Sequence, residues 1–167
     1  MVSTTFDHLA PQKQARIRQA LLDEFSQHPL ATAQVARIVA QAGIARGAFY
    51  KYFDDLTDAY RYVFGLAMQD IHAGLPQPDG HEAAAYLAAT RAFLTGVRES
   101  PYRALIRQHF RANADRLHNG PSRLGPSPTA WAATTLCHQT IRDVLLEPDT
   151  ATARLAQLAT ALDQMEG

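Results

Sequence analysis

The amino-acid sequence predicts an all-α protein, and its composition and its spacing of apolar residues both support this fold class. Thirty Ala and 18 Leu stand against 6 Val and 6 Ile, a balance that favours helices over strands. Prolines and glycines divide the 167 residues into pieces of helical length, and apolar residues recur three and four positions apart within those pieces. We therefore expect about eight helices.

Three helices are predicted near the N-terminus, over 11–26, 35–42 and 45–53. The first ends at His28-Pro29, because the residue before a proline disfavours the α conformation. The second ends at Gly43, because glycine tolerates the positive φ of a helix C-terminus or tight turn. Only a residue or two separates it from the third, so the sequence predicts a sharp corner between them.

Five further helices are predicted over 58–73, 82–99, 101–117, 127–145 and 148–165. Pro/Gly-rich breaks at 74–80 and 118–128 separate them into groups. Ser100-Pro101 and Ser127-Pro128 each have the pattern of an N-cap serine followed by a proline at the first helical position. The apolar seams of the last two helices suit packing against other helices.

Length and composition exclude several classes of protein. A chain of 167 residues with one cysteine, Cys137, has the size of about one ordinary domain and no disulfide framework. Its longest uninterrupted hydrophobic stretch is 83–89, far short of the ~20 residues that span a bilayer. With no secretory signal visible, we expect a cytoplasmic protein without a membrane span.

Charge is balanced overall but not along the chain. The 16 Lys and Arg equal the 16 Asp and Glu, which alone argues against a nucleic-acid partner. From Phe25 to Phe53, however, no acidic residue occurs, while Arg37, Arg46 and Lys51 are present. This local excess of positive charge lies over the second and third predicted helices.

Three short helices joined by a sharp corner predict a helix-turn-helix, in which one helix braces the next against DNA. The stretch Ala-Gly-Ile-Ala-Arg-Gly-Ala-Phe-Tyr-Lys-Tyr-Phe at 42–53 resembles the TetR family of bacterial transcriptional regulators. The Ala-Gly turn, Arg46-Gly47 and the closing Tyr-x-Tyr-Phe carry the resemblance, which covers roughly 17–63. It implies a DNA-binding domain over 1–54 and a helical effector-binding and dimerisation domain over 55–167. The function implied is a homodimeric repressor of a palindromic operator, with a possible small-molecule effector.

Six residues are candidates for DNA contacts: Gln34, Arg46, Gly47, Tyr50, Lys51 and Tyr52. Arginine and lysine bind phosphates or guanine, and a tyrosine hydroxyl can donate to a phosphate; the resemblance puts both tyrosines on the DNA side. Gly47 permits a close approach either of backbone to phosphate or of helix to helix, and Gln34 either contacts a phosphate or caps its helix. Phe49 and Phe53 share one helical face and are predicted to be core.

Three positions depart from the family pattern. Ala45 stands where Ser or Thr is common, Leu56 where lysine is common, and Val39 where a small alanine is frequent. Either DNA affinity is modest, or other cations such as Arg16, Arg18 and Arg37 compensate.

The rest of the chain offers candidates for an effector site and a dimer interface. Inward-facing residues proposed for an effector are Tyr86, Phe93, Tyr102, His109, Phe110 and Trp131. Residues proposed for the dimer interface are Ile141, Leu145, Leu155, Leu158 and Leu162. In both sets the alternative is that the side chains belong to the chain's own core.

No catalytic or metal-binding motif is visible. The seven histidines do not form the HExxH pattern of a zinc site, although His72, His81, His109, His118 and His138 have the chemistry of metal ligands. Cys137 is interpreted as a buried structural cysteine. We therefore expect no cofactor, no metal and no enzyme; the alternative function is a helical adaptor that uses the same N-terminal fold for protein contacts.

Overall fold

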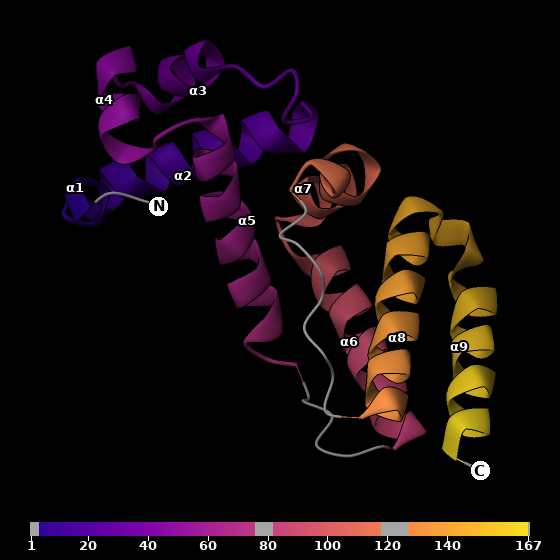
Figure 1. Cartoon of the computed structure of the whole chain (residues 1–167). Helices are drawn as coiled ribbons and strands as arrows, with labels where there is room; N and C mark the ends of the chain where they lie inside the picture. The colour runs from indigo at the N-terminus through magenta and orange to yellow at the C-terminus, as the bar shows by residue number, and fades with distance from the viewer. Residues whose placement is uncertain (1–3, 76–81, 118–126, 167) are drawn as a thin grey trace. The chain divides into compact units, whose positions relative to one another are not determined.

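The computed structural model describes residues 4–75, 82–117 and 127–166. Within these ranges the chain forms nine α-helices and no strand, which confirms the predicted fold class. The α-helices in Figure 1 are α1 (Thr4–Asp7), α2 (Pro11–Gln27), α3 (Val35–Ala42), α4 (Arg46–Tyr52), α5 (Leu56–His72), α6 (Ala83–Glu99), α7 (Arg103–Gln108), α8 (Pro128–Leu146) and α9 (Ala151–Glu166). The two expected Pro/Gly-rich breaks lie mostly outside the described residues.

The chain divides into two compact units. The first comprises Met1–Asp70 and Pro101–Arg116, and the second comprises Ile71–Ser100 and Leu117–Gly167. This division differs from a single boundary after residue 54, because α7 returns to pack against α2. Each unit is therefore built from segments that are distant in sequence.

The first unit contains the predicted helix-turn-helix. Helices α2, α3 and α4 pack against one another, with most of their contacts between α2 and α3. The apolar faces that the spacing predicts are buried: Ile17, Leu21 and Phe25 of α2 and Ile38 of α3 are all 0% exposed. Burying these faces supplies most of the stability of such short helices.

Helix α1 was not predicted, because four residues are too few to show a helical period. It packs against α4, and its Phe6 is fully buried. Gln14 of α2 donates from Nε2 to the carbonyl oxygens of Phe6, Asp7 and Leu9, at 3.1, 3.0 and 3.2 Å. The side chain thus satisfies carbonyl groups that a helix end leaves without partners.

The helix predicted over 101–117 is interrupted. Ser100 is not its N-cap but the C-cap of α6, and its hydroxyl donates to the Val97 carbonyl at 3.0 Å. Helix α7 begins at Arg103 and continues as a π-helical turn, His109–Asn113, and a 3-10 turn, Asp115–Leu117. The N–H of Ala114 bonds to the His109 carbonyl at 2.8 Å, five residues back, as a π turn requires.

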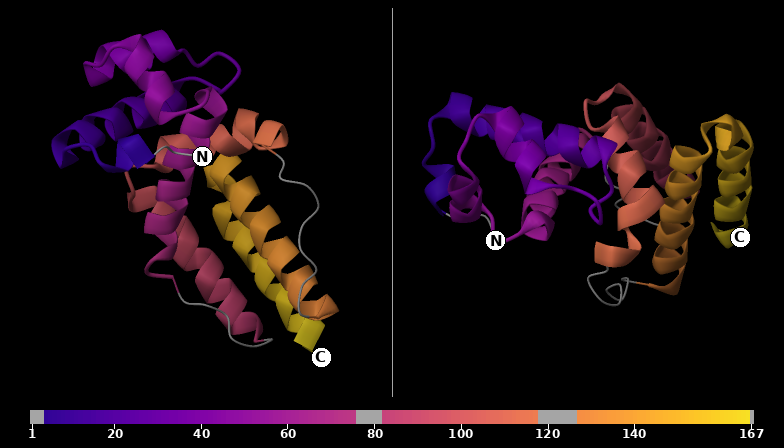
Figure 2. Two further views of the ribbon diagram at one scale, coloured as in Figure 1. Left: turned by 60° about the vertical axis from the view of Figure 1, so that its left-hand side comes forward. Right: turned by 90° about the horizontal axis from the view of Figure 1, so that it is seen from above.

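The second unit contains a bundle of three helices, α6, α8 and α9, each in contact with the other two. Figure 2 shows α8 and α9 side by side, joined by the short 3-10 turn Pro148–Thr150. The predicted cap of α8 is confirmed: the Ser127 hydroxyl accepts the Ala130 N–H at 3.1 Å, and Pro128 opens the helix. The centre of the bundle is formed by Ala83, Ala133, Cys137, Leu158 and Leu162.

None of the described helices combines the length and the hydropathy that crossing a membrane requires.

Candidate nucleic-acid interface

The turn between α3 and α4 depends on Gly43. This residue has φ 64° and ψ 43°, the left-handed conformation that ends α3. A Cβ here would meet nothing within 4 Å among the described residues, so the backbone conformation and not crowding requires glycine. The predicted turn role of Gly43 is confirmed, and only three residues separate α3 from α4.

Helix α4 presents a buried face and an exposed face. Phe49 and Phe53 are 0% and 1% exposed, with ring centroids 5.4 Å apart, so their predicted core role is confirmed. Arg46, Gly47, Tyr50 and Lys51 are exposed. The structure therefore brings four of the six candidate DNA contacts together on one short helix.

The exposed face combines positive charge with an aromatic ring. Tyr50 is 50% exposed, and the guanidinium carbon of Arg46 lies 6.0 Å from its ring centroid, within reach of a cation–π interaction. A Cβ on Gly47 would meet no described atom within 4 Å. The structure thus gives no support to helix crowding at Gly47, and leaves its backbone open to a partner.

The prediction for Tyr52 is corrected by the structure. The sequence interpretation placed it on the DNA side, but its side chain is 4% exposed and belongs to the core. Its ring meets that of Phe6 edge to face, with centroids 5.7 Å apart, and the Lys13 ammonium lies 5.9 Å from its centroid. The error has a physical cause: the residue that covers Tyr52 comes from α1, an element that the spacing of apolar residues does not reveal.

Gln34 is the N-cap residue of α3, yet within the described part of the chain its side chain makes no capping bond. Its backbone N–H donates instead to Oε1 of Glu24 at 2.7 Å. The capping alternative for the Gln34 side chain is therefore not supported. The side chain itself is exposed.

Glu24 and Arg37 form an ion pair that joins α2 to α3. Arg37 donates from Nε to Oε2 at 2.8 Å and from Nη2 to Oε1 at 2.6 Å, a forked geometry that is strong for this pair of groups. Glu24 is 5% exposed. Burial raises the pKa of its carboxyl, but the hydrogen bonds from Arg37 and from the Gln34 N–H lower it more, so its pKa lies below the ordinary value.

Two of the three cations proposed to compensate for Ala45 and Leu56 are engaged inside the first unit. Arg37 is paired with Glu24, and Arg18 donates from Nε to the Tyr62 hydroxyl at 2.6 Å. Arg16 is exposed. The structure therefore favours Arg16 over the other two as an additional phosphate contact.

The six effector candidates do not form one cluster within either unit. Tyr102, His109 and Phe110 belong to the first unit, and Tyr86, Phe93 and Trp131 to the second. Trp131 is 52% exposed, which contradicts an inward orientation, whereas Phe93 is 8% exposed.

In the first unit, His109 packs among aromatic rings. Its ring stacks on Phe64 with centroids 4.1 Å apart, and its Nδ1 lies 3.0 Å from the Tyr60 hydroxyl oxygen. Burial lowers the pKa of His109 and raises that of Tyr60 to about 12. The Tyr102 hydroxyl donates to Asp70 at 2.7 Å, which raises the pKa of Tyr102 to about 12.

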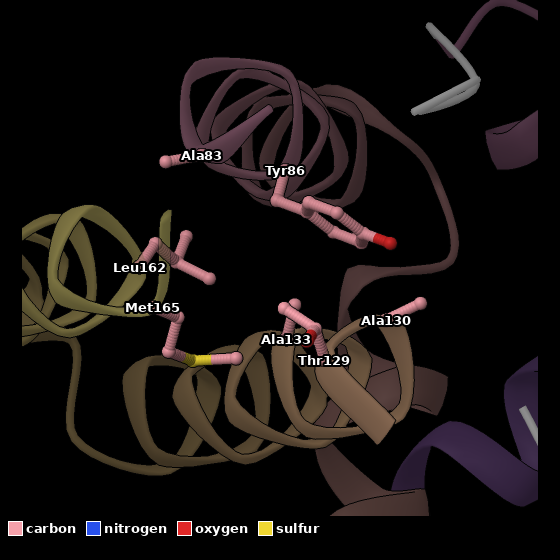
Figure 3. Close-up of a pocket in the computed structure, with 7 residues that line it drawn as sticks. All are labelled: Ala83, Tyr86, Thr129, Ala130, Ala133, Leu162 and Met165. Atoms are coloured by element: carbon pink, nitrogen blue, oxygen red, sulfur yellow. The ribbon is translucent and has the colours of Figure 1, made fainter. Parts of the chain in front are cut away.

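In the second unit, Tyr86 lines a small apolar pocket. Figure 3 shows its ring facing Ala133 and Thr129 of α8, with Leu162 and Met165 of α9 alongside. The cavity volume is 10 Å³, room for about one water molecule. In this conformation the pocket is too small for an effector.

The expected dimer residues are largely core residues, which is a second correction. Ile141, Leu145, Leu158 and Leu162 are each at most 8% exposed within the single chain, and only Leu155 is half-buried. Leu158 and Leu162 pack with Ala83 of α6 and Ala133 and Cys137 of α8, the alternative left open by the sequence.

A different face of α8 and α9 is open. A groove of 230 Å³ runs along them, lined by Leu136, Gln139, Thr140, Asp143, Arg154, Gln157, Leu158 and Ala161. Arg154 pairs with Asp143 across it at 2.8 Å. We call this surface the α8–α9 groove.

The described residues do not assemble a set of potential metal ligands. No group of three metal-ligating side chains occurs among them, and His81 and His118 lie outside them. Cys137 is buried, as expected, and burial raises the pKa of its thiol, which disfavours the nucleophilic thiolate.

Comparison with known proteins agrees with this geometry. Residues 17–56 match the model of the family described as bacterial regulatory proteins, tetR family. This segment runs from Ile17, within α2, to the first residue of α5 and contains the whole exposed face of α4. A comparison with curated proteins found no match.

Solved structures share the fold over nearly the whole chain. A TetR family transcriptional regulator from Chloroflexus aurantiacus is 19% identical, with a TM-score of 0.61 over 99% of this chain and 97% of that one. A transcriptional regulator from Streptomyces coelicolor, described as putative in its name, is 22% identical, with a TM-score of 0.62 over 92% and 97%. A TetR regulator from Rhodococcus is 18% identical, with a TM-score of 0.54 over 92% and 96%. At these identities the likeness shows the fold alone.

Proposed function

We propose that this chain, whose residues 17–56 match the tetR family of bacterial regulatory proteins, represses transcription by binding a palindromic operator as a homodimer. The observation that supports this most is the exposed Arg46–Tyr50 pair beside Gly47 on α4. It joins a cation, an aromatic hydroxyl and an open stretch of backbone on a helix that the Gly43 turn holds in place.

Each exposed group of α4 has a role in this proposal. Arg46 binds a guanine edge or a phosphate, Lys51 binds a phosphate, and the Tyr50 hydroxyl donates to a phosphate oxygen. Gly47 lets the helix backbone approach the DNA closely. The Gln34 side chain, exposed at the start of α3, adds a phosphate contact.

The Glu24–Arg37 pair supports binding indirectly. An unpaired carboxylate near the start of α3 would repel phosphates. Because Arg37 contacts both oxygens of Glu24, this charge is neutralised locally, and the surface of α3 and α4 keeps its excess of positive charge.

A homodimer supplies the second half-site. One three-helix module contacts few base pairs, whereas two copies of α4 spaced about 34–36 Å apart contact two half-sites whose centres lie one turn of DNA apart. We assign the interface to the α8–α9 groove, because a two-fold axis there pairs α8 and α9 with their copies in a four-helix bundle.

The proposal also includes regulation by a small molecule in the cytoplasm, without catalysis by the chain itself. The aromatic cluster at His109 in the first unit, with Tyr60 and Phe64, provides aromatic side chains that such a ligand would contact. An effector that binds one of two conformations better shifts the dimer between DNA-competent and incompetent states.

The test measures binding to random-sequence duplex DNA at several salt concentrations. Phosphate contacts release counterions, so the logarithm of the association constant should fall linearly with the logarithm of salt concentration. Arg46→Ala should weaken binding, and Arg142→Ala, an exposed residue of α8, is the matched control. Binding that is absent, or indifferent to salt, would contradict the proposal and favour the adaptor.

A further inference from the structure

Helix α1 lies outside the segment that matches the family and makes the closest aromatic contacts with α4. The Phe6 ring lies 5.3 Å from that of Phe53 and 5.7 Å from that of Tyr52, both centroid to centroid. It also meets Tyr62 of α5 at 5.3 Å, edge to face. One side chain from the N-terminal segment therefore joins the end of α4 to α5.

Helix α1 is fixed to the domain at its other side by polar contacts. The three hydrogen bonds from Nε2 of Gln14 hold the carbonyls of Phe6, Asp7 and Leu9, and Gln14 also accepts from Arg18 at 3.2 Å. The N-terminal segment is thus held by the buried Phe6 ring and by the Gln14 side-chain amide, which hydrogen-bonds to its backbone carbonyls.

Helix α4 has little stability of its own. It has seven residues, whereas isolated helices shorter than about 12 residues are marginal in water. Its N-cap, Ala45, has no side-chain oxygen, and its second residue, Gly47, is a poor helix former. Its position therefore depends on three buried rings, Phe49, Tyr52 and Phe53, and Phe6 covers two of them.

We propose that Phe6 is a positioning residue for DNA recognition, and that α1 acts as a clamp that holds α4 in its DNA-binding position. The inference rests on the proposed role of α4. Phe6 is fully buried and so acts through Tyr52 and Phe53 rather than by touching DNA.

The clamp acts by raising the fraction of molecules in which α4 occupies its DNA-binding position. Without the Phe6 ring, Tyr52 and Phe53 lose a packed neighbour, and α4 samples other positions. If α4 holds its DNA-binding position for about a tenth of the time, the apparent affinity falls about tenfold. The exposed groups of α4 are unchanged, so the dependence on salt should keep its slope.

The experiment compares five variants with the wild type on a duplex that the wild type selects from a random pool; the fifth, Phe6→Leu, is the conservative replacement. Phe6→Ala removes the ring, and Gln14→Ala releases the backbone of α1 without opening a cavity. Thr5→Ala, exposed on α1, is the surface control. Leu105→Ala is the core control, because Leu105 is equally buried but lies on α7.

Two readouts separate positioning from general stability. Phe6→Ala and Gln14→Ala should lower affinity, Phe6→Ala by about tenfold, and should speed amide hydrogen exchange in α4 more than in α2 or α3. Leu105→Ala should lower thermal stability but leave the affinity of the folded fraction and α4 exchange unchanged. Phe6→Leu should recover affinity to within about threefold of the wild type, because it refills most of the volume.

Failure of the clamp and failure of the proposed function give different results. If the wild type binds no DNA, the proposed function fails and the clamp with it. If the wild type binds, but Phe6→Ala and Gln14→Ala bind equally well with α4 still protected, only the clamp is overturned. An equal loss of affinity in Leu105→Ala would also overturn it, because the effect would then be one of stability.

Discussion

Arg46 and Tyr50 lie one helical turn apart, and their side chains meet on the exposed face of α4. Because neither is buried, replacing either one removes surface contacts without opening a cavity. Arg46→Ala and Tyr50→Ala should each weaken DNA binding by about 1–3 kcal/mol while thermal stability stays unchanged. Tyr50→Phe keeps the ring and isolates the hydroxyl. Retained affinity in both alanine variants, measured by fluorescence anisotropy, would remove α4 as the contact surface.

The stability of the helix-turn-helix depends on the buried carboxylate of Glu24. Glu24→Gln should lower the free energy of unfolding by about 1–3 kcal/mol, because hydrogen bonds to a buried charge are lost. Asp23→Asn, at the neighbouring carboxylate that accepts from Gln19 and Gln41, should cost less. Denaturant titration measures the free energy of unfolding of both variants. Equal losses would show that the Glu24–Arg37 ion pair contributes no more stability than the hydrogen bonds of Asp23.

The lowered pKa of Glu24 also sets the sign of a pH effect. A carboxyl whose pKa is lower in the folded than in the unfolded state stabilises the fold above its ordinary pKa of 4.5. The stabilisation is lost as pH falls below 4.5 through the folded-state value. In Glu24→Gln this part of the acid sensitivity should disappear.

His109 produces acid sensitivity in a higher range. Burial lowers its pKa below the ordinary value of 6.5, so the unfolded chain takes up the proton first. Stability from the neutral ring is complete above pH 6.5 and declines as pH falls below it. His109→Phe keeps the stacking on Phe64 and should lose less stability between pH 7.5 and pH 5.5, as urea titrations at about those two values would show. An equal loss in variant and wild type would assign the effect to another group, such as His138, whose pKa burial also lowers.

At the scale of one element, the two glycines that flank the start of α4 should respond in opposite ways. Gly43→Ala forces a side chain into the left-handed region and should cost about 1–2 kcal/mol of stability. Gly47→Ala meets open space and should stabilise α4 by up to about 1 kcal/mol, yet weaken DNA binding by holding the backbone away. Thermal denaturation and DNA titration of both variants check this. A Gly47→Ala variant with full affinity would exclude a close backbone approach.

The helix pattern of the sequence predicts some elements to the residue and misses others. The bounds 35–42 agree with α3, because its apolar period is clear and Gly43 ends it. Helix α1 escapes prediction because it is shorter than one heptad. The π turn at 109–113 escapes because the same apolar spacing suits both kinds of helical turn.

The candidate site shows the same limit. The helical period predicts that Arg46, Tyr50 and Lys51 are exposed on α4. The burial of Tyr52, however, depends on Phe6, which lies 46 positions earlier in the sequence. Likewise, an apolar seam on α9 does not tell whether Leu158 and Leu162 face a copy or their own chain. Contacts distant in sequence decide both questions.

At the scale of the whole molecule, DNA recognition as proposed needs a second copy of the chain. Ala161→Arg places a charge in the α8–α9 groove without touching the core of the second unit, and should yield a folded monomer by sedimentation with weakened operator binding. Leu162→Arg, at a side chain 2% exposed, is the contrasting variant and should unfold the unit. A dimeric Ala161→Arg protein would place the interface elsewhere.

The π turn in the first unit determines in which direction the side chains of its last residues point. Each residue of an α-helix advances the direction of its side chain by about 100°, and a π turn contains one residue more than an α turn. Asn113 ends this turn, and its Oδ1 accepts the N–H of Leu30, between α2 and α3, at 2.9 Å. If the same residues formed a regular α-helix instead, Asn113 would turn away from its present direction by up to about 100°. The bond to Leu30 would then be lost although both residues that form it remained, so this contact depends on the wide turn as well as on the Asn113 side chain.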